Sequence, residues 1–302
     1  MSGADTFDLQ NNISGDQLAY DIASQYDEWA GLAYEARKQW ADVRNYVYAT
    51  DTSHTENNLN PWSNSTIRPK LANIYDNLTV NYQYALFPND DWLTFVGHDE
   101  DSSLAVKRKI VEDYLKTKHQ LSDFYEVTKE LINDWVLTGN CFCSVSYSNN
   151  QTSDPLTGED VVAYTGPVIN RISPYDIVFN PRATNFENSP KIIRILKTEG
   201  ELFNDVNESP ETNYAADALA LIQRDRGVIK SLPEDDINKS MSFIPDGFSS
   251  PSQYYNSGCV ELLEFYGDIY DPETGEMLKN YVVTIADGRY ILRKQPLSTW
   301  SG

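Results

Sequence analysis

The sequence predicts an α+β fold, because apolar residues recur with a helical period up to about residue 140 and with the two-residue period of strands after it. The chain has 302 residues, enough to bury a core in one large domain or two ordinary ones. Aromatic residues make up 12% of the chain, which argues against disorder. We expect a flexible N-terminus at 1–16, a helical region at 17–140 and a hairpin-rich region at 141–302.

The first expected helix runs from about Leu18 to Val47, with apolar residues at alternating steps of three and four. Part of this pattern repeats every seven residues, as in the seam of a coiled coil, at Ile22, Trp29, Ala36 and Val43. Such a seam packs inside a helix bundle of its own chain or against a neighbouring subunit, and the sequence leaves both alternatives open.

Three more helices are expected before residue 140, each with one apolar face. The second ends at Pro88, the third is capped by Asp101 and Ser102, and the fourth is capped by Ser122 and ends at Gly139. The apolar face of the second consists of Ile67, Leu71, Ile74, Leu78, Tyr82 and Ala85, and that of the third of Ile110, Val111, Tyr114 and Leu115.

The later region predicts two hairpins joined by short helices. The first hairpin spans about 142–172 around a Gly-containing loop at 154–159, and the second region ends with the tight-turn dipeptide Asp287-Gly288. Between them, Thr198 and Glu201 have the spacing of a capping box, and a helix is expected at 211–230. A long loop should follow at 233–253.

The stretch from Ile172 to Arg194 combines two Pro-containing turns with apolar runs. It predicts the end of a strand, a turn at Ser173-Pro174, a short strand at 175–179 and a turn at Asn180-Pro181. A loop at 182–189 then leads to a further strand beginning near residue 191.

The net charge of −21 and a pI of about 4.4 disfavour binding to nucleic acid by simple charge attraction. No apolar run approaches the length of about 18 residues that predicts a membrane span, and the N-terminus does not resemble a signal peptide. The three cysteines leave one unpaired in any disulfide scheme, which fits a reducing compartment.

No familiar catalytic or phosphate-binding motif occurs in the sequence, and we expect no enzyme activity, no metal site and no cofactor. The three histidines lack a second ligand at metal spacing. Cys141 and Cys143 are expected to be small, half-buried strand residues, with a metal or redox role as the alternative. Paired acidic residues are expected in solvated turns, although two carboxylates are also what a hydrolase needs.

The densest basic cluster in this acidic chain is Lys107, Arg108 and Lys109. Three uses are open: pairing within the chain with Glu112 and Asp113, contact with an acidic neighbouring subunit, or contact with DNA phosphate. These three residues are therefore candidate interaction residues.

A series of short motifs follows in order between about residues 25 and 296. They are Trp40-Ala-Asp-Val-Arg44, Ser65-Thr-Ile-Arg-Pro-Lys70, Leu86-Phe-Pro88, Trp135-Val-Leu-Thr-Gly-Asn140, Ile172-Ser-Pro-Tyr-Asp-Ile177, Asn180-Pro-Arg-Ala183 and Val260-Glu-Leu-Leu-Glu-Phe-Tyr-Gly267. In this order they resemble the portal, or head-to-tail connector, proteins of tailed bacteriophages, especially the short-tailed ones.

The resemblance implies a structural subunit of a ring, typically of twelve copies, at one vertex of the capsid. Double-stranded DNA passes non-specifically through such a ring, and its partners are the terminase motor, the major capsid protein and a tail adaptor protein, with no membrane. The expected location is the virion, and the host cytoplasm during assembly. In the ring, Arg182 and Arg194 are expected to bond acidic groups within or between subunits.

Portal proteins are usually longer than this chain, which resembles their wing region with the possible start of the clip. We therefore expect the natural chain to continue past Gly302 and transfer no channel-lining residue to it. The alternatives are another acidic structural protein of the virion, such as an adaptor or tail component, and a carboxylate-based hydrolase.

Overall fold

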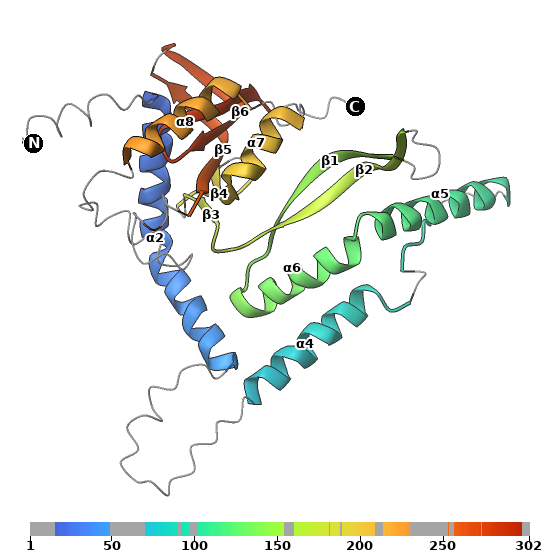
Figure 1. The fold of residues 1–302 in the computed structure, drawn as a ribbon. Helices are drawn as coiled ribbons and strands as arrows, with labels where there is room; N and C mark the ends of the chain where they lie inside the picture. Colours follow the sequence, from blue (N-terminus) through green and yellow to red (C-terminus); the bar gives the residue numbers. More distant parts are fainter. Residues whose placement is uncertain are drawn as a thin grey trace, which may run out of the picture. The chain divides into compact units, whose positions relative to one another are not determined.

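The computed structural model describes residues 16–48, 70–89, 92–96, 102–153, 160–180, 182–187, 189–208, 214–229, 253, 257–272 and 274–297. Helices and antiparallel sheets confirm the α+β fold (Figure 1). The chain forms two compact units: unit 1 comprises Met1–Tyr34 and Asp176–Gly302, and unit 2 comprises Glu35–Tyr175. The units therefore do not divide at residue 140, because the first hairpin forms a separate two-stranded sheet and packs on the helices before it.

Unit 1 is built on a five-stranded antiparallel sheet whose strands are neighbours in sequence and in space. Its strands are β3 (Ile177–Phe179), β4 (Lys191–Thr198), β5 (Cys259–Asp271), β6 (Glu276–Ala286) and β7 (Tyr290–Pro296). The tight turn predicted between β6 and β7 is confirmed. Asp287 and Gly288 have φ of 50° and 65°, and the Arg289 N–H donates to the Ala286 carbonyl at 3.0 Å.

Helix α2 (Gln17–Tyr48) covers one face of this sheet with its first half. Leu18, Ile22 and Phe265 are each at most 1% exposed at this contact. The first half of the predicted seam, Ile22 and Trp29, thus packs within the chain, on a sheet and not in a helix bundle, whereas Ala36 and Val43 are exposed. Burying such side chains stabilises the unit by about 1.5–3 kcal/mol each.

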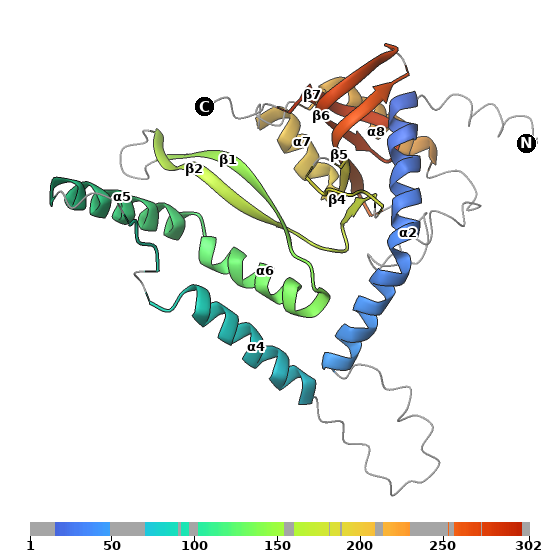
Figure 2. The ribbon, with the colours of Figure 1, turned by 180° about the vertical axis from the view of Figure 1, so that it is seen from behind.

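Helices α7 (Glu199–Glu208) and α8 (Ala216–Ile229) cover the other face of the sheet (Figures 1 and 2). Leu202 and Ile222 are fully buried there against Leu262. The capping box is also confirmed. The Thr198 N–H and hydroxyl donate to the Glu201 carboxylate at 2.8 and 3.0 Å, which lowers the pKa of Glu201, and the Glu201 N–H donates to the Thr198 hydroxyl at 3.2 Å.

Unit 2 combines the second half of α2 with three helices and a hairpin: α4 (Lys70–Leu86), α5 (Ser102–Leu121), α6 (Phe124–Thr138), β1 (Phe142–Ser153) and β2 (Asp160–Ile172). Helices α4 and α6 lie side by side (Figures 1 and 2). The rings of Tyr82 and Trp135 meet at 4.7 Å, and the Tyr75 hydroxyl donates to the Asn133 carbonyl at 3.5 Å. Strands β1 and β2 confirm the first hairpin.

The start of α6 differs from its prediction. The cap position is Asp123, with φ of 52°, and not Ser122, whose hydroxyl donates to the His119 carbonyl at 3.3 Å and so belongs to the end of α5. The predicted end is confirmed, because Gly139 has φ of 76° and its N–H donates to the Trp135 carbonyl at 2.9 Å.

The stretch from Ile172 to Arg194 follows its prediction closely. Strand β2 ends at Ile172, a turn follows, β3 begins two residues later than expected, and β4 begins at Lys191. The predicted loops at 51–65 and 154–159, the N-terminal residues 1–15 and nearly all of 233–253 lie outside the described residues.

Two predictions of burial are wrong. Leu71, Ile74 and Leu78 of α4 are 41–54% exposed, because α4 meets α6 through Tyr75 and Tyr82. Cys141 and Cys143, expected to be half-buried, are both exposed. In unit 2, α6 contacts α4, α5 and β2, and many apolar side chains of the unit stay exposed among the described residues.

Candidate interaction surface

The three basic residues predicted on α5 point in different directions. Lys107 and Lys109 are exposed, whereas Arg108 is half-buried and donates from Nε to the Leu104 carbonyl at 3.4 Å. Glu112 accepts the Phe95 N–H at 2.7 Å. Within the described part of the chain no ion pair joins the basic cluster to Glu112, Asp113 or another carboxylate.

Arg194 is a structural residue of unit 1. Its side chain is 8% exposed, its Nε donates to Glu261 Oε1 at 2.5 Å, and its guanidinium lies 3.8 Å from the Asp176 carboxylate. It therefore ties β4 to β5 and to the turn before β3. Arg182 is exposed in the turn after β3, where its N–H donates to Asn180 Oδ1 at 3.0 Å, and its side chain remains available to a partner.

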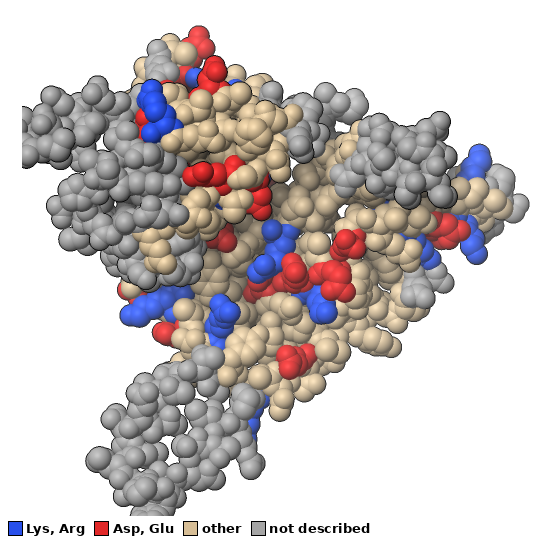
Figure 3. Space-filling model, in the orientation of Figure 1, with Lys and Arg blue, Asp and Glu red and all other residues tan. Residues whose placement is uncertain are grey.

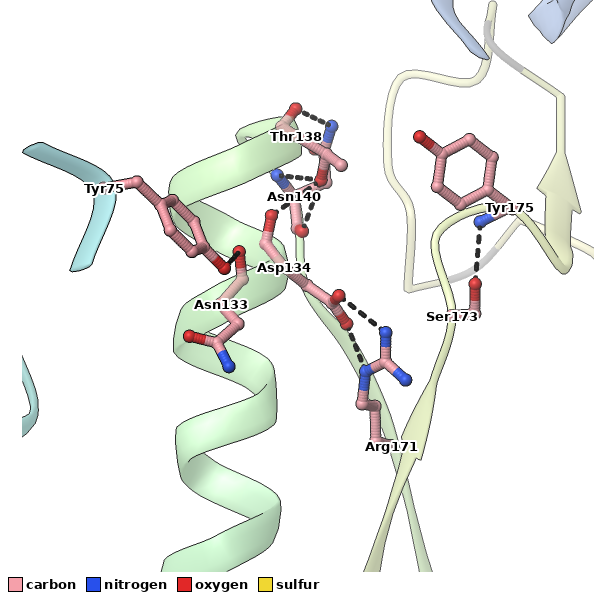
Figure 4. A network of polar contacts seen from close by, with 8 residues as sticks. All are labelled: Tyr75, Asn133, Asp134, Thr138, Asn140, Arg171, Ser173 and Tyr175. Carbon is pink, nitrogen blue, oxygen red and sulfur yellow. Dashed lines mark hydrogen bonds and ion pairs between the residues drawn. The ribbon is translucent and has the colours of Figure 1, made fainter. Parts of the chain in front are cut away.

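A partly buried ion pair joins α6 to β2 (Figure 4). Arg171 donates from Nε and from Nη2 to the two oxygens of Asp134, at 2.5 and 2.7 Å. This two-point geometry fixes both side chains. The Thr138 hydroxyl donates to the Asp134 carbonyl at 2.9 Å and accepts the Asn140 N–H at 3.3 Å, which continues the network to the end of α6. Sequence reasoning did not single out this pair.

Tyr175 lies near the same network on the turn after β2 (Figure 4). Its N–H donates to the Ser173 hydroxyl at 3.3 Å, and its ring meets Trp40 edge-on at 5.8 Å. Its hydroxyl is buried and has no hydrogen-bond partner among the described residues, and burial raises its pKa. We assign it a packing role.

An aromatic cluster fixes the inner face of α5. The rings of Trp92 and Phe124 stack at 5.8 Å with an interplanar angle of 11°, and His119 of α5 lies 4.5 Å from Phe124. Burial lowers the pKa of His119. Because these contacts hold one side of α5 to the start of α6, the opposite side of the helix faces outward.

The outward side of α5 carries a row of apolar side chains. Val106, Ile110 and Tyr114 follow each other at steps of four residues and are 63%, 63% and 59% exposed. Lys107 and Lys109 flank this row on its two sides. We call these five residues the outer stripe of α5. Two of the residues predicted as the inner apolar face, Ile110 and Tyr114, belong to it, so that prediction is wrong.

The rest of unit 2 adds to this exposed apolar surface. On the face shown in Figure 3 the surface over α4 is mostly uncharged, whereas charges of both signs lie towards α5. Large exposed apolar side chains of unit 2 outside α5 include Leu71, Ile74, Val80, Tyr84, Val145, Tyr147 and Val162. An area of this kind marks an interaction surface more often than a free one.

The buried carboxylates of unit 1 serve its structure. Asp271 is completely buried and bonds Lys294, and Glu264 accepts from Arg293 at 2.9 Å. The described residues contain no group of three or more His, Cys, Asp or Glu side chains placed to hold a metal ion. No described helix is both long enough and apolar enough to cross a membrane.

Neither a protein-family model nor a curated protein matches this sequence. The resemblance to portal proteins therefore depends on the motifs and their order.

The signal for the outer stripe was present in the sequence but ambiguous. Apolar residues of α5 occur on more than one side of the helix, at Leu104, Val106, Ile110, Val111, Tyr114, Leu115 and Leu121. Periodicity alone does not say which of these rows packs inward. The aromatic cluster around His119 determines which side of α5 packs inward, and that cluster joins residues from separate parts of the chain.

Proposed function

We propose that the chain is a structural subunit of a phage portal ring, which forms the channel for packaging and ejecting the genome and the attachment point of the tail. The single observation that carries this proposal is the exposed apolar surface of unit 2, above all the outer stripe of α5. An isolated subunit leaves this surface in water, whereas neighbouring subunits of a ring cover it. The order of helices and hairpins is also the order that the resemblance implies.

The charge of the chain suits a channel for DNA. At −21 it repels the phosphate backbone, so DNA sliding past meets no deep binding well. In this proposal the ring has about twelve copies, as the resemblance implies, and its other partners are the terminase motor, the major capsid protein and the tail adaptor.

Electron microscopy of the purified chain tests the proposal, together with light scattering on a size-exclusion column. We expect rings with a central hole wide enough for duplex DNA and a mass many times the 34.3 kDa of one chain. A homogeneous monomer at micromolar concentration would contradict the proposal.

A further inference from the structure

The charge of α5 is opposite to that of the chain as a whole. The helix carries five basic and two acidic side chains, a net charge of +3, within a chain whose net charge is −21. Lys107 and Lys109 of its outer stripe are exposed and have no ion pair within the described residues. A partner surface should therefore be acidic and partly apolar.

The first half of α2 offers such a surface in unit 1. Asp21 and Glu28 are exposed and seven residues apart, so they lie on the same side of the helix. Leu32, one turn beyond Glu28, is 47% exposed. This side lies beside the row of Leu18 and Ile22 that packs on the sheet, and the Asp21 carboxylate also accepts a hydrogen bond from Gln17 Nε2 at 3.0 Å. We call Asp21, Glu28 and Leu32 the acidic face of α2.

The two surfaces are complementary in chemistry, and both are about two to three helical turns long. At a rise of 1.5 Å per residue, Val106 to Tyr114 spans about 12 Å and Asp21 to Leu32 about 16 Å. Lysines flank the apolar row on α5, and carboxylates accompany the exposed leucine on α2. Contact between two copies of α5 would instead bring lysines together, which costs free energy.

We propose that the outer stripe of α5 docks on the acidic face of α2 of a second copy of this chain. The proposal rests on the proposed function and names the contact within it. Because the two surfaces differ, each copy uses one surface towards each of two neighbours, which is the contact type that closes into rings. DNA is a poorer occupant of α5, since the surrounding chain repels it.

Reciprocal charge reversal tests this pairing in the full chain. Variant A carries Lys107→Glu and Lys109→Glu, and variant B carries Asp21→Lys and Glu28→Lys. Each alone places like charges across every contact, so we expect at least about a tenfold weaker association and loss of the assembled peak. An equimolar mixture restores opposite charges at contacts between A and B, and the assembled peak should return with both variants in it.

Two control variants match these changes in charge at exposed positions outside both surfaces. Lys129→Glu with Lys279→Glu matches variant A, and Glu130→Lys with Glu276→Lys matches variant B. Both should assemble like the unchanged chain. Circular dichroism checks that all variants fold, and Lys107→Gln with Lys109→Gln replaces variant A if it does not.

The outcomes separate this inference from the proposed function. If the unchanged chain forms rings and variants A and B do so equally well, the contact is wrong and the ring remains. If A and B each fail but their mixture also fails, α5 and α2 do not pair with each other. If the unchanged chain is a monomer, the ring proposal and this contact are both overturned.

Discussion

The ion pair between Asp134 and Arg171 provides the sharpest test of how unit 2 is held together. Replacing Arg171 with Met keeps much of its apolar contact but leaves the Asp134 carboxylate, whose side chain is 11% exposed, without its cation. Breaking a buried pair in this way costs about 3–5 kcal/mol. Arg171 is 35% exposed, so water reaches part of the site, and we expect a loss of about 2–3 kcal/mol.

The paired replacement separates the contribution of the interaction from that of each side chain. Asp134→Leu alone should also destabilise unit 2, because it removes both hydrogen bonds that the Arg171 guanidinium donates to the carboxylate. The double variant Asp134→Leu with Arg171→Met removes both charges of the pair and should lose only about 1 kcal/mol, since apolar replacement of a whole ion pair away from water is often nearly neutral. The coupling free energy of this cycle should be about 2 kcal/mol or more.

Amide hydrogen exchange followed by mass spectrometry is the assay, because it reports the opening of α6 and β2 separately from that of unit 1. Lys129→Met is the control on the same helix. Lys129 lies 3.7 Å from Glu126 in an exposed pair, and its loss should change exchange free energies by less than about 0.5 kcal/mol. The ion pair does not hold α6 to β2 if the effects of the two single variants simply add. The same conclusion follows if they change exchange no more than Lys129→Met does.

Three further predictions concern stability. Phe265→Ala, at a side chain that is 1% exposed, should lower the free energy of unfolding of unit 1 by about 3–5 kcal/mol in urea denaturation, against less than about 0.5 for the exposed Phe203→Ala. Gly288→Ala should cost about 1–2 kcal/mol in the same assay, because φ is 65° and the new Cβ would lie 3.2 Å from Ala23; an unchanged midpoint would contradict it. The folded-state pKa of His119 lies below its ordinary value of 6.5, so its contribution to stability is present above pH 6.5 and is lost as the pH falls through the folded pKa. His119→Gln should therefore reduce the slope of melting temperature against pH below 6.5. An unchanged slope would show that His119 does not cause the loss of stability at low pH.

Predictions that depend on neighbours in the chain were the most accurate. The capping box at Thr198, the left-handed Gly139 and the turn at Asp287 each involve hydrogen bonds and dihedral angles within a few residues. The exception is Ser122, one residue before the true cap at Asp123, where two helices almost meet and a serine serves the end of the first.

Predictions of which side is buried were less accurate, because burial depends on distant parts of the chain. Helix α4 has a wide apolar surface, and it meets α6 through the side that carries Tyr75 and Tyr82. The candidate Arg194 turned out to pair within its own unit, with a partner 67 residues away in β5. Asp134 and Arg171 are 37 residues apart, and no local pattern connects them.

The sequence by itself determined the α+β class, nearly all helix and strand positions, and the net charge of −21. These features follow from periodicity, turn chemistry and composition, which are local or additive. Only the tertiary structure decided that α2 packs on a sheet, that Asp134 meets Arg171, and that Val106, Ile110 and Tyr114 face outward. An apolar row on a helix is buried only where another element is near enough to cover it, and that depends on the path of the whole chain.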